Sequence, residues 1–270
     1  MKTRAITGFF FIVVMLASVH LGHYFFSIFY LILGLLCLHE FYGLNIKSGI
    51  QPNRTSGFIN AVIIYSLFAV INYHDKSVYH GLLLLSTLSL SAVFIQELFK
   101  ISVAPFSNIA YTFAGIIFVI LPFTFFHALA FITGTFNFHF PLAFLLMLWA
   151  NDTGAYLVGR AFGRTKLFER HSPKKTWEGF IGGVAISAGV GFVISLYFNE
   201  MASGKWISIA ILIGCFGTLG DLVESMFKRS INIKDSGGIL PGHGGLLDRF
   251  DGFLLAAPIV YTYLYFVLNA

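Results

Sequence analysis

Charged residues are scarce in this sequence, since only 11% of its 270 residues are Asp, Glu, Lys or Arg. A soluble domain carries about 25%, so this composition excludes an ordinary soluble globular protein. Cysteine is nearly absent as well. Cys37 and Cys215 are the two cysteines, and both lie within apolar stretches. The chain therefore has neither a disulfide framework nor the ligand spacing of a zinc site.

Hydrophobic residues make up 57% of the chain, and apolar runs recur along its whole length. A run of about 20 apolar residues is long enough to cross a bilayer as a helix. We therefore predict an all-α, polytopic integral membrane protein with about nine transmembrane helices. The expected spans are residues 5–22, 24–44, 55–72, 81–98, 109–126, 140–160, 178–198, 206–227 and 252–269.

The first two predicted spans are nearly continuous, with a break at Leu21-Gly22-His23 that is typical of a tight hairpin. The basic start and the first apolar run also fit a signal peptide. A small-residue cleavage site is not recognisable after the run, and another apolar run follows at once. We expect this segment to remain as the first spanning helix.

Basic residues are distributed very unequally when the loops are assigned alternately to the two sides of a membrane. All but two of the 17 Lys and Arg residues fall on one side, and the other side holds Lys76 and Lys205. Basic residues mark the cytoplasmic side, so we predict the N-terminus inside and the C-terminus outside. The net charge of +5 then reflects topology, and no nucleic-acid partner is expected.

Dense polar clusters occur only in the second half of the chain. We interpret residues 1–145 as N-terminal scaffold helices and residues 146–270 as a C-terminal catalytic half with a cytoplasm-facing site. The clusters read NDTGAYLVGRAFGRTK, HSPKKTWEG and GDLVESMFKRSINIKDSGGILPGHGGLLDRFDG.

Asp221 lies near the cytoplasmic end of the eighth predicted span. On a helix it shares one face with Glu224, Ser225 and Lys228, because these residues follow at i+3, i+4 and i+7. A carboxylate at membrane depth costs several kcal/mol unless it is paired, hydrated or bound to a cation. Two interpretations stay open, namely an ion pair with Lys228 in helix packing and a carboxylate that faces a polar cavity.

Asp248 and Asp251 are three residues apart at the expected start of the last span. Two carboxylates with this spacing suit one hard cation, most plausibly Mg²⁺, and otherwise repel each other unless Arg249 offsets them. An ordinary helix start with acidic residues in its first turn is the alternative. The preceding His243-Gly244-Gly245 favours the first interpretation, since paired glycines let backbone N–H groups approach an anion.

HSPKKTWEG predicts a helix start, with Ser172 as N-cap and Pro173 in the first turn. Lys174 and Lys175 would then stand at a helix N-terminus and attract phosphate. A basic loop that binds lipid headgroups is the alternative.

Two further patterns concern the interior of the helices. Asp152, beside Asn151, belongs either to the same polar cavity or to hydrogen bonds within the bundle. Small residues recur every four positions at 179, 183, 187 and 191, which predicts a face for close helix packing. His39-Glu40 predicts no zinc site, because position 43 is glycine and the second histidine of HExxH is missing.

Acids suited to Mg²⁺, cations suited to phosphate and glycine-rich loops thus gather on one membrane face. This combination predicts phosphoryl or nucleotidyl transfer at the cytoplasmic boundary, where a soluble nucleotide would be joined to a lipid. A polytopic transporter of a phosphorylated or anionic solute is the alternative. Its ionisable residues would lie near the bilayer midplane in two matching halves, and the sequence has no such repeat.

Residues 225–251, SMFKRSINIKDSGGILPGHGGLLDRFD, resemble the signature of the phosphatidate cytidylyltransferases, also called CDP-diacylglycerol synthases. NDTGAYLVGRAFGR and SPKKTWEG resemble the other characteristic stretches of that family. The signature positions have counterparts at Ser225, Lys228, Arg229, Lys234, Asp235, Pro241, His243, Gly244, Gly245, Asp248, Arg249 and Asp251.

The resemblance implies the reaction CTP + phosphatidate → CDP-diacylglycerol + pyrophosphate, in a homodimer of the bacterial inner membrane. It implies Mg²⁺ near Asp221 and Asp248, and it leaves K⁺ open as a second ion. Asp221, Asp248 and Asp251 are expected to bind the metal, and together with Lys228 they form the expected catalytic set. The expected substrate-binding residues are Ser172, Lys174, Lys175, Ser225, Arg229, Lys234, His243, Gly244, Gly245 and Arg249. A preference for CTP rests on the resemblance alone.

Overall fold

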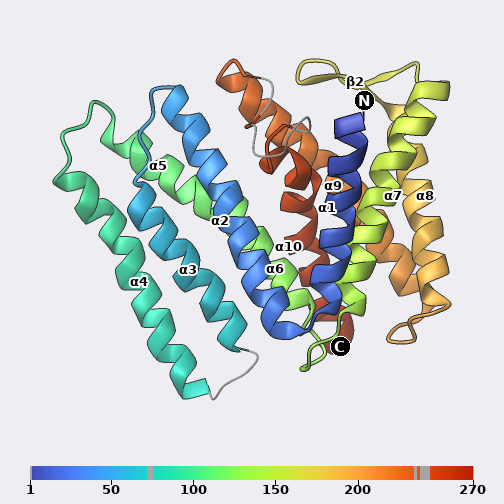
Figure 1. Cartoon of the computed structure of the whole chain (residues 1–270), viewed down its shortest axis with the longest axis horizontal. Coiled ribbons are helices and arrows are strands. Elements are labelled where there is room, and N and C mark those ends of the chain that lie inside the picture. Colours follow the sequence, from blue (N-terminus) through green and yellow to red (C-terminus); the bar gives the residue numbers. More distant parts are fainter. Residues whose placement is uncertain (1, 72–75, 234–235, 238–243, 270) are drawn as a thin grey trace. The chain divides into compact units, whose positions relative to one another are not determined.

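The structure, a computed structural model, describes residues 2–71, 76–233, 236–237 and 244–269. Each of the nine predicted apolar runs coincides with helix in the described chain (Figure 1). Six helical segments are long and apolar enough to cross a membrane, and they identify an integral membrane protein. They are His23–Lys47, Pro105–Leu129, His139–Phe162, Trp177–Ser195, Ser203–Ser230 and Leu247–Leu268.

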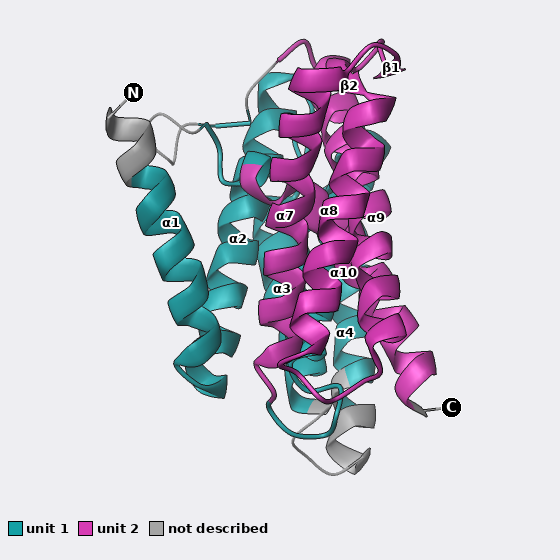
Figure 2. Cartoon of the chain, turned by 90° about the vertical axis from the view of Figure 1, so that its right-hand side faces the viewer, with its two compact units in different colours: residues 1–136, 235–248 teal, residues 137–234, 249–270 magenta. Residues whose placement is uncertain are grey.

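The chain divides into two compact units, coloured separately in Figure 2. Unit 1 comprises Met1–Phe136 and Asp235–Asp248, and unit 2 comprises Asn137–Lys234 and Arg249–Ala270. The predicted boundary after residue 145 is a functional one, between a scaffold half and a catalytic half. It stays a prediction, because compact packing does not test it.

Unit 1 is built from helices that carry apolar side chains on most of their faces. They are α1 (Lys2–His20), α2 (His23–Lys47), α3 (Arg54–Ile71), α4 (Lys76–Leu98), and the continuous α5 (Pro105–Gly115), η1 (Ile116–Ile120) and α6 (Leu121–Leu129). The π-helical turn η1 precedes Pro122, which cannot donate to the helical hydrogen-bond ladder. Gly22, with φ +94°, makes the predicted break between α1 and α2.

Tyr42 holds three helices of unit 1 together. Its hydroxyl donates to the carbonyl oxygen of Thr112 at 2.8 Å. Gly57 of α3 and Gly115 of α5 both lie against its ring, where a Cβ atom would collide. Close helix approach at small residues is the usual way for membrane helices to pack.

Unit 2 contains α7 (His139–Phe162), β1 (Lys166–Phe168), β2 (Ser172–Thr176), α8 (Trp177–Ser195), α9 (Ser203–Ser230) and most of α10 (Leu247–Asn269). Its helices form one bundle in Figure 2. The predicted helical fold class is confirmed, and the described chain adds one short antiparallel strand pair, β1–β2, between α7 and α8.

The predicted small-residue face of α8 is confirmed. Gly179 lies against the backbone of Ala155, and Gly183 lies against the backbone of Asn151. Ser187 donates within hydrogen-bond distance of two carbonyl oxygens, Met147 O at 3.0 Å and Ala210 O at 3.3 Å. One side chain thereby links α8 to both α7 and α9.

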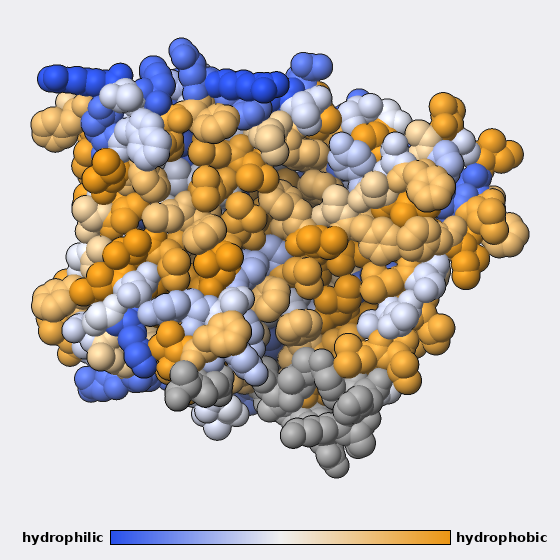
Figure 3. Space-filling view, turned by 180° about the vertical axis from the view of Figure 1, so that it is seen from behind, coloured by the Kyte–Doolittle hydropathy of each residue, from blue (hydrophilic) through white to orange (hydrophobic). Residues whose placement is uncertain are grey.

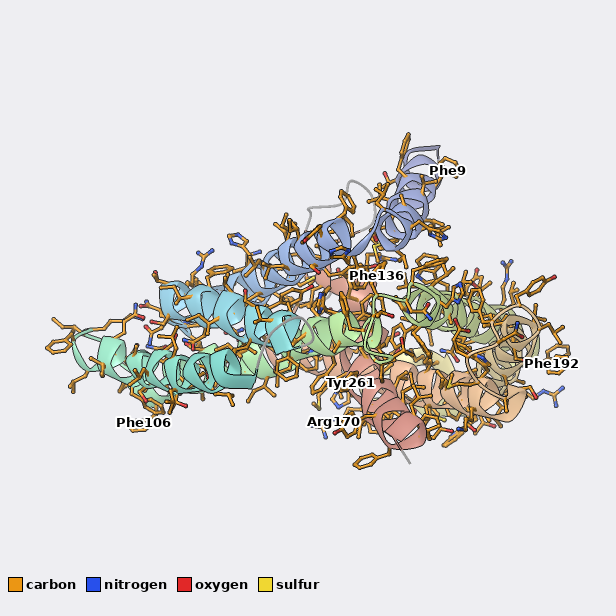
Figure 4. All side chains as sticks on the ribbon, turned by 90° about the horizontal axis from the view of Figure 1, so that it is seen from below. Phe9, Phe106, Phe136, Arg170, Phe192 and Tyr261 are labelled. Atoms are coloured by element: carbon orange, nitrogen blue, oxygen red, sulfur yellow. The ribbon has the colours of Figure 1, made fainter. Side chains whose placement is uncertain are left out.

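The outer surface fits a lipid environment. Figure 3 shows apolar side chains over most of the visible face, with hydrophilic side chains gathered along its upper edge. Phe9, Phe106 and Phe192 project outward in Figure 4, and their exposed fractions are 65%, 77% and 49%. Burying such side chains in lipid removes the cost of exposing them to water.

Candidate active site

The candidate site of unit 2 begins with a close crossing of α9 and α10. A Cβ atom on Gly220 would lie 2.5 Å from the carbonyl oxygen of Asp251 and 3.1 Å from the Cα atom of Gly252. Only glycine allows two backbones to approach so closely. The crossing carries Asp221, the next residue of α9, toward Asp251 in the first turns of α10.

Four carboxylates of unit 2 gather around this crossing. Asp251 lies within electrostatic reach of Asp221, Glu224 and Asp152, and Asp152 also interacts with Asp221. Carboxylates that interact in this way repel each other when ionised, unless cations or protons offset their charge. The cluster therefore favours bound cations.

Two lysines supply short ion pairs to this cluster. Lys175 Nζ lies 2.6 Å from Asp221 Oδ2, and Lys228 Nζ lies 2.6 Å from Glu224 Oε2. Ser225 Oγ donates to Asp221 Oδ1 at 3.3 Å. The predicted shared helix face is thus confirmed, but Lys228 pairs with Glu224 and the partner of Asp221 comes from β2.

The Glu224–Lys228 pair is the more deeply buried of the two. The Glu224 side chain is fully buried and that of Lys228 is 12% exposed. Removing one partner of such a pair costs about 3–5 kcal/mol, because the other charge is left uncompensated. The Asp221 and Lys175 side chains are 34% and 25% exposed, so this second pair remains accessible to a ligand.

These carboxylates fit a hard cation by their chemistry. Mg²⁺ takes oxygen ligands and is usually held by one or two protein carboxylates, while water and substrate phosphates complete its shell. Within the described residues, acids, histidines and cysteines do not form a closed group of three around a common point. In the described chain, the cation paired with Asp221 is the Lys175 ammonium.

Asp248 belongs to unit 1 and is held by backbone donors. Ser236 N lies 3.0 Å and Gly245 N 2.9 Å from its Oδ2 atom. Gly244 has φ +82°, a conformation that favours glycine. The N–H group of Gly245, predicted to cradle phosphate, is bonded to Asp248 here, so a role of this residue toward substrate stays a prediction.

The predicted helix start at Ser172 is wrong. Ser172–Thr176 forms strand β2, so Lys174 and Lys175 do not stand at a helix N-terminus. Helix α8 begins at Trp177, and Thr176 is its N-cap, with Oγ1 accepting from Gly179 N at 3.2 Å.

Two residues that anchor this hairpin were missed from the sequence. Besides the N-cap Thr176, Glu178 accepts from the backbone N–H groups of Arg164 and Thr165 at 3.1 Å each. Thr at the N-cap followed by an acid in the first turn is a recognisable signal. It was missed because Ser172-Pro173, four residues earlier, also matches a helix start.

The remaining predicted residues have varied surroundings. Arg229 is exposed and donates to the carbonyl oxygen of Ile233 at 3.2 Å. Arg249 is exposed and interacts electrostatically with Asp152, so Asp152 belongs to the charged cluster as well as accepting weakly from Asn151 at 3.4 Å. Lys234 and His243 lie outside the described residues.

Comparison with known proteins gives matches over nearly the full length of the chain. The model of the cytidylyltransferase family matches residues 2–267. A phosphatidate cytidylyltransferase of Staphylococcus aureus (strain COL) is 35% identical over 263 residues. That of Staphylococcus haemolyticus (strain JCSC1435) is 33% identical over 262 residues. Both alignments cover 96% of this chain and 97% of the relative.

Proposed function

The chain belongs to the cytidylyltransferase family, and from this premise we propose that it converts CTP and phosphatidate to CDP-diacylglycerol and pyrophosphate. The observation that carries the proposal is the charged cluster of unit 2. Its acids and lysines supply what nucleotidyl transfer requires, namely cation ligands and positive charge for phosphates.

The proposed reaction is an in-line displacement at phosphorus. A phosphate oxygen of phosphatidate forms a bond to the α-phosphorus of CTP, and the bond from that phosphorus to the bridging oxygen of the β-phosphate breaks. Pyrophosphate leaves with the electron pair. A phosphate monoester has its second pKa near 6, so the nucleophile is largely ionised at neutral pH and a dedicated general base is not required.

Asp221, Asp248 and Asp251 are the proposed ligands of Mg²⁺, and Lys228 completes the proposed catalytic set. When bound, Mg²⁺ would neutralise phosphate charge and orient the triphosphate. The family resemblance leaves K⁺ open as a second ion. The support is the oxygen chemistry of the three acids and, for Asp221 and Asp251, their gathering at the crossing of α9 and α10; the inclusion of Asp248 rests on the resemblance.

The basic side chains have proposed roles in binding the triphosphate and the lipid phosphate. Lys174 and Lys175 bind the triphosphate, and Lys228, Arg229 and Arg249 offset charge on the phosphates. The remaining proposed substrate-binding residues are Ser172, Ser225, Lys234, His243, Gly244 and Gly245. Cations hold phosphates by charge and by hydrogen bonds from their N–H groups.

We further propose nine membrane crossings, with the N-terminus and the site on the cytoplasmic side of a bacterial inner membrane. The distribution of basic residues supports this orientation. Phosphatidate would then come from the surrounding membrane lipid, and CTP from the cytoplasm. A homodimer is the proposed assembly.

The test is pyrophosphate release by detergent-purified protein supplied with CTP, Mg²⁺ and phosphatidate, compared with Asp248→Asn. We expect release that depends on phosphatidate, and a loss of at least about 10²-fold in the variant, because a lost electrostatic group at a reacting phosphate costs that much. Both proteins should insert and purify equally. Near-normal turnover by Asp248→Asn would overturn the metal-ligand assignment, and release without the lipid would overturn the reaction.

A further inference from the structure

Glu40 is a buried carboxylate of α2 that the proposed mechanism does not use. It lies in the C-terminal third of the apolar helix α2, and only 6% of its surface is exposed. Its Oε1 atom is buried and has no hydrogen-bond partner within the described residues. Burying a carboxylate in this way costs stability, which indicates a role other than holding the scaffold together.

The carboxylate of Glu40 binds the start of α10. Leu247 N donates to Glu40 Oε2 at 2.8 Å, although the two residues are 207 positions apart in the chain. Leu247 is the first residue of α10, so its N–H group has no partner within the helix. A negative charge at a helix N-terminus is also favourable toward the helix dipole.

Two glycines of the same segment make room for this carboxylate. A Cβ atom on Gly245 would lie 2.8 Å from Glu40 Oε2, and one on Gly237 would collide with Glu40 Oε1. Side chains at these positions would displace either the carboxylate or the backbone. Glu40 therefore lies directly against residues 237 and 245 as well as bonding to residue 247.

The segment that Glu40 contacts also orients Asp248. The donors to the Asp248 carboxylate are Ser236 N and Gly245 N, each adjacent to or identical with a residue in contact with Glu40. We propose that Glu40 is a positioning residue. By its contacts with Gly237, Gly245 and Leu247 it holds the backbone on both sides of Asp248's donors, so that the Asp248 carboxylate keeps one orientation. The catalytic meaning of the proposal rests on the proposed function, in which Asp248 is a metal ligand.

Amide hydrogen exchange tests the positioning directly and does not require turnover. We expect Glu40→Ala to accelerate exchange in a peptide that covers residues 244–250, because the N–H group of Leu247 loses its acceptor and the hydrogen bond from Gly245 N to Asp248 loses the packing beside it. The matched control is Glu97→Ala. Glu97 is another buried carboxylate of unit 1, but it accepts from Ser102 and Asn108, so the 244–250 peptide should exchange as in the wild type.

The metal dependence of pyrophosphate release supplies the second measurement. We expect Glu40→Ala to raise the half-saturating Mg²⁺ concentration roughly 10–100-fold, as is usual when a supporting partner of a ligand is lost. A merely structural role would lower the maximal rate and leave this concentration unchanged. Glu97→Ala should leave the half-saturating concentration unaltered.

Unchanged exchange of the 244–250 peptide in folded Glu40→Ala would overturn the proposal, and so would equal acceleration throughout unit 1. If Glu40→Ala does not fold, Gly237→Ala replaces it, since its methyl group displaces the carboxylate, and the same expectations apply. Failure of the metal-ligand assignment is a separate result, namely near-normal turnover by Asp248→Asn, and failure of the proposed reaction is another, namely pyrophosphate release without phosphatidate. The exchange experiment still decides the role of Glu40 in that case.

Discussion

Asp221 and Lys175 form an ion pair between a helix and a hairpin, and both are proposed to bind parts of the substrate complex. The Lys175 ammonium lies 2.6 Å from Asp221 Oδ2. Arrival of Mg²⁺ and the triphosphate would offer each partner a competing ion of opposite charge. The ion pair keeps the two side chains near each other.

Replacing Lys175 with Gln should weaken CTP binding. Loss of a charged hydrogen bond costs about 1.5–3 kcal/mol, so the KM for CTP should rise roughly 10–100-fold, with a smaller change in KM for phosphatidate. Steady-state kinetics of pyrophosphate release would measure both. Lys166→Gln is the matched control, because it removes the same charge from an exposed position of the same hairpin.

An unchanged KM for CTP in Lys175→Gln would remove Lys175 from triphosphate binding. If the KM for CTP rose equally in Lys166→Gln, the cause would be general attraction of CTP by a basic surface. Salt screens such attraction between exposed charges at distances beyond about 10 Å.

Single residues also show which parts of the site the sequence could predict. Ser225 bonds to Asp221 as its i+4 spacing predicts, since helix geometry alone brings the two together. Lys175 and Glu40 act through partners on other elements, and for Glu40 the partner is 207 residues away. Local spacing contains no information on such contacts, so they required the structure.

Among the elements, the β1–β2 hairpin shows how a local signal can mislead. Ser172-Pro173 matches a helix start, but a stronger start follows four residues later at Thr176. Glu178 fixes that start by binding the backbone of residues 164 and 165, and Trp177 N donates to Thr165 O at 2.9 Å. The partners in these contacts are residues 164 and 165, which precede β1. Sequence propensity around residues 172–178 contains no information on them.

The crossing of α9 and α10 leads to a prediction about Gly220. In Gly220→Ala the new methyl group would meet the backbone oxygen of Asp251 at 2.5 Å, and backbone cannot move aside as a side chain can. We expect a loss of about 1–3 kcal/mol in stability. Activity should fall by up to roughly 10²-fold, because a displacement of about 1 Å at a site has that effect.

Gly189→Ala is the control for this substitution. Gly189 lies on the exposed face of α8, where a Cβ atom would have no neighbour within 4 Å. Its thermal midpoint in detergent and its activity should match the wild type or exceed it slightly. Equal behaviour of the two variants would show that the close crossing does not position the site.

For the whole molecule, the positions of the helices were predictable because a bilayer requires each crossing to be a long apolar helix. All nine runs are helical in the described chain, and six meet the length and hydropathy expected of a span. The described apolar parts of the other three are shorter, at Thr7–His20, Arg54–Val70 and Leu83–Leu98. Nine crossings therefore stay a prediction.

The assignment of residues 235–248 to unit 1 was not predictable from the sequence. This segment belongs with the N-terminal helices, although it follows α9 in the chain. Its Leu247 donates to Glu40, a buried carboxylate that looks like an isolated acid in an apolar run of the sequence. The predicted division into a scaffold half and a catalytic half at residue 145 therefore differs from the division into compact units that packing gives.

The central claim is that this membrane protein transfers the cytidylyl group of CTP to phosphatidate. The most direct measurement is transfer of radioactive phosphorus into lipid by protein reconstituted in phosphatidate-containing vesicles with Mg²⁺. We predict that α-labelled CTP labels the extracted lipid, that γ-labelled CTP releases its label as pyrophosphate, and that Asp248→Asn does neither. Hydrolysis of CTP without α-label in the lipid, or lipid labelling from the γ-position, would contradict the account.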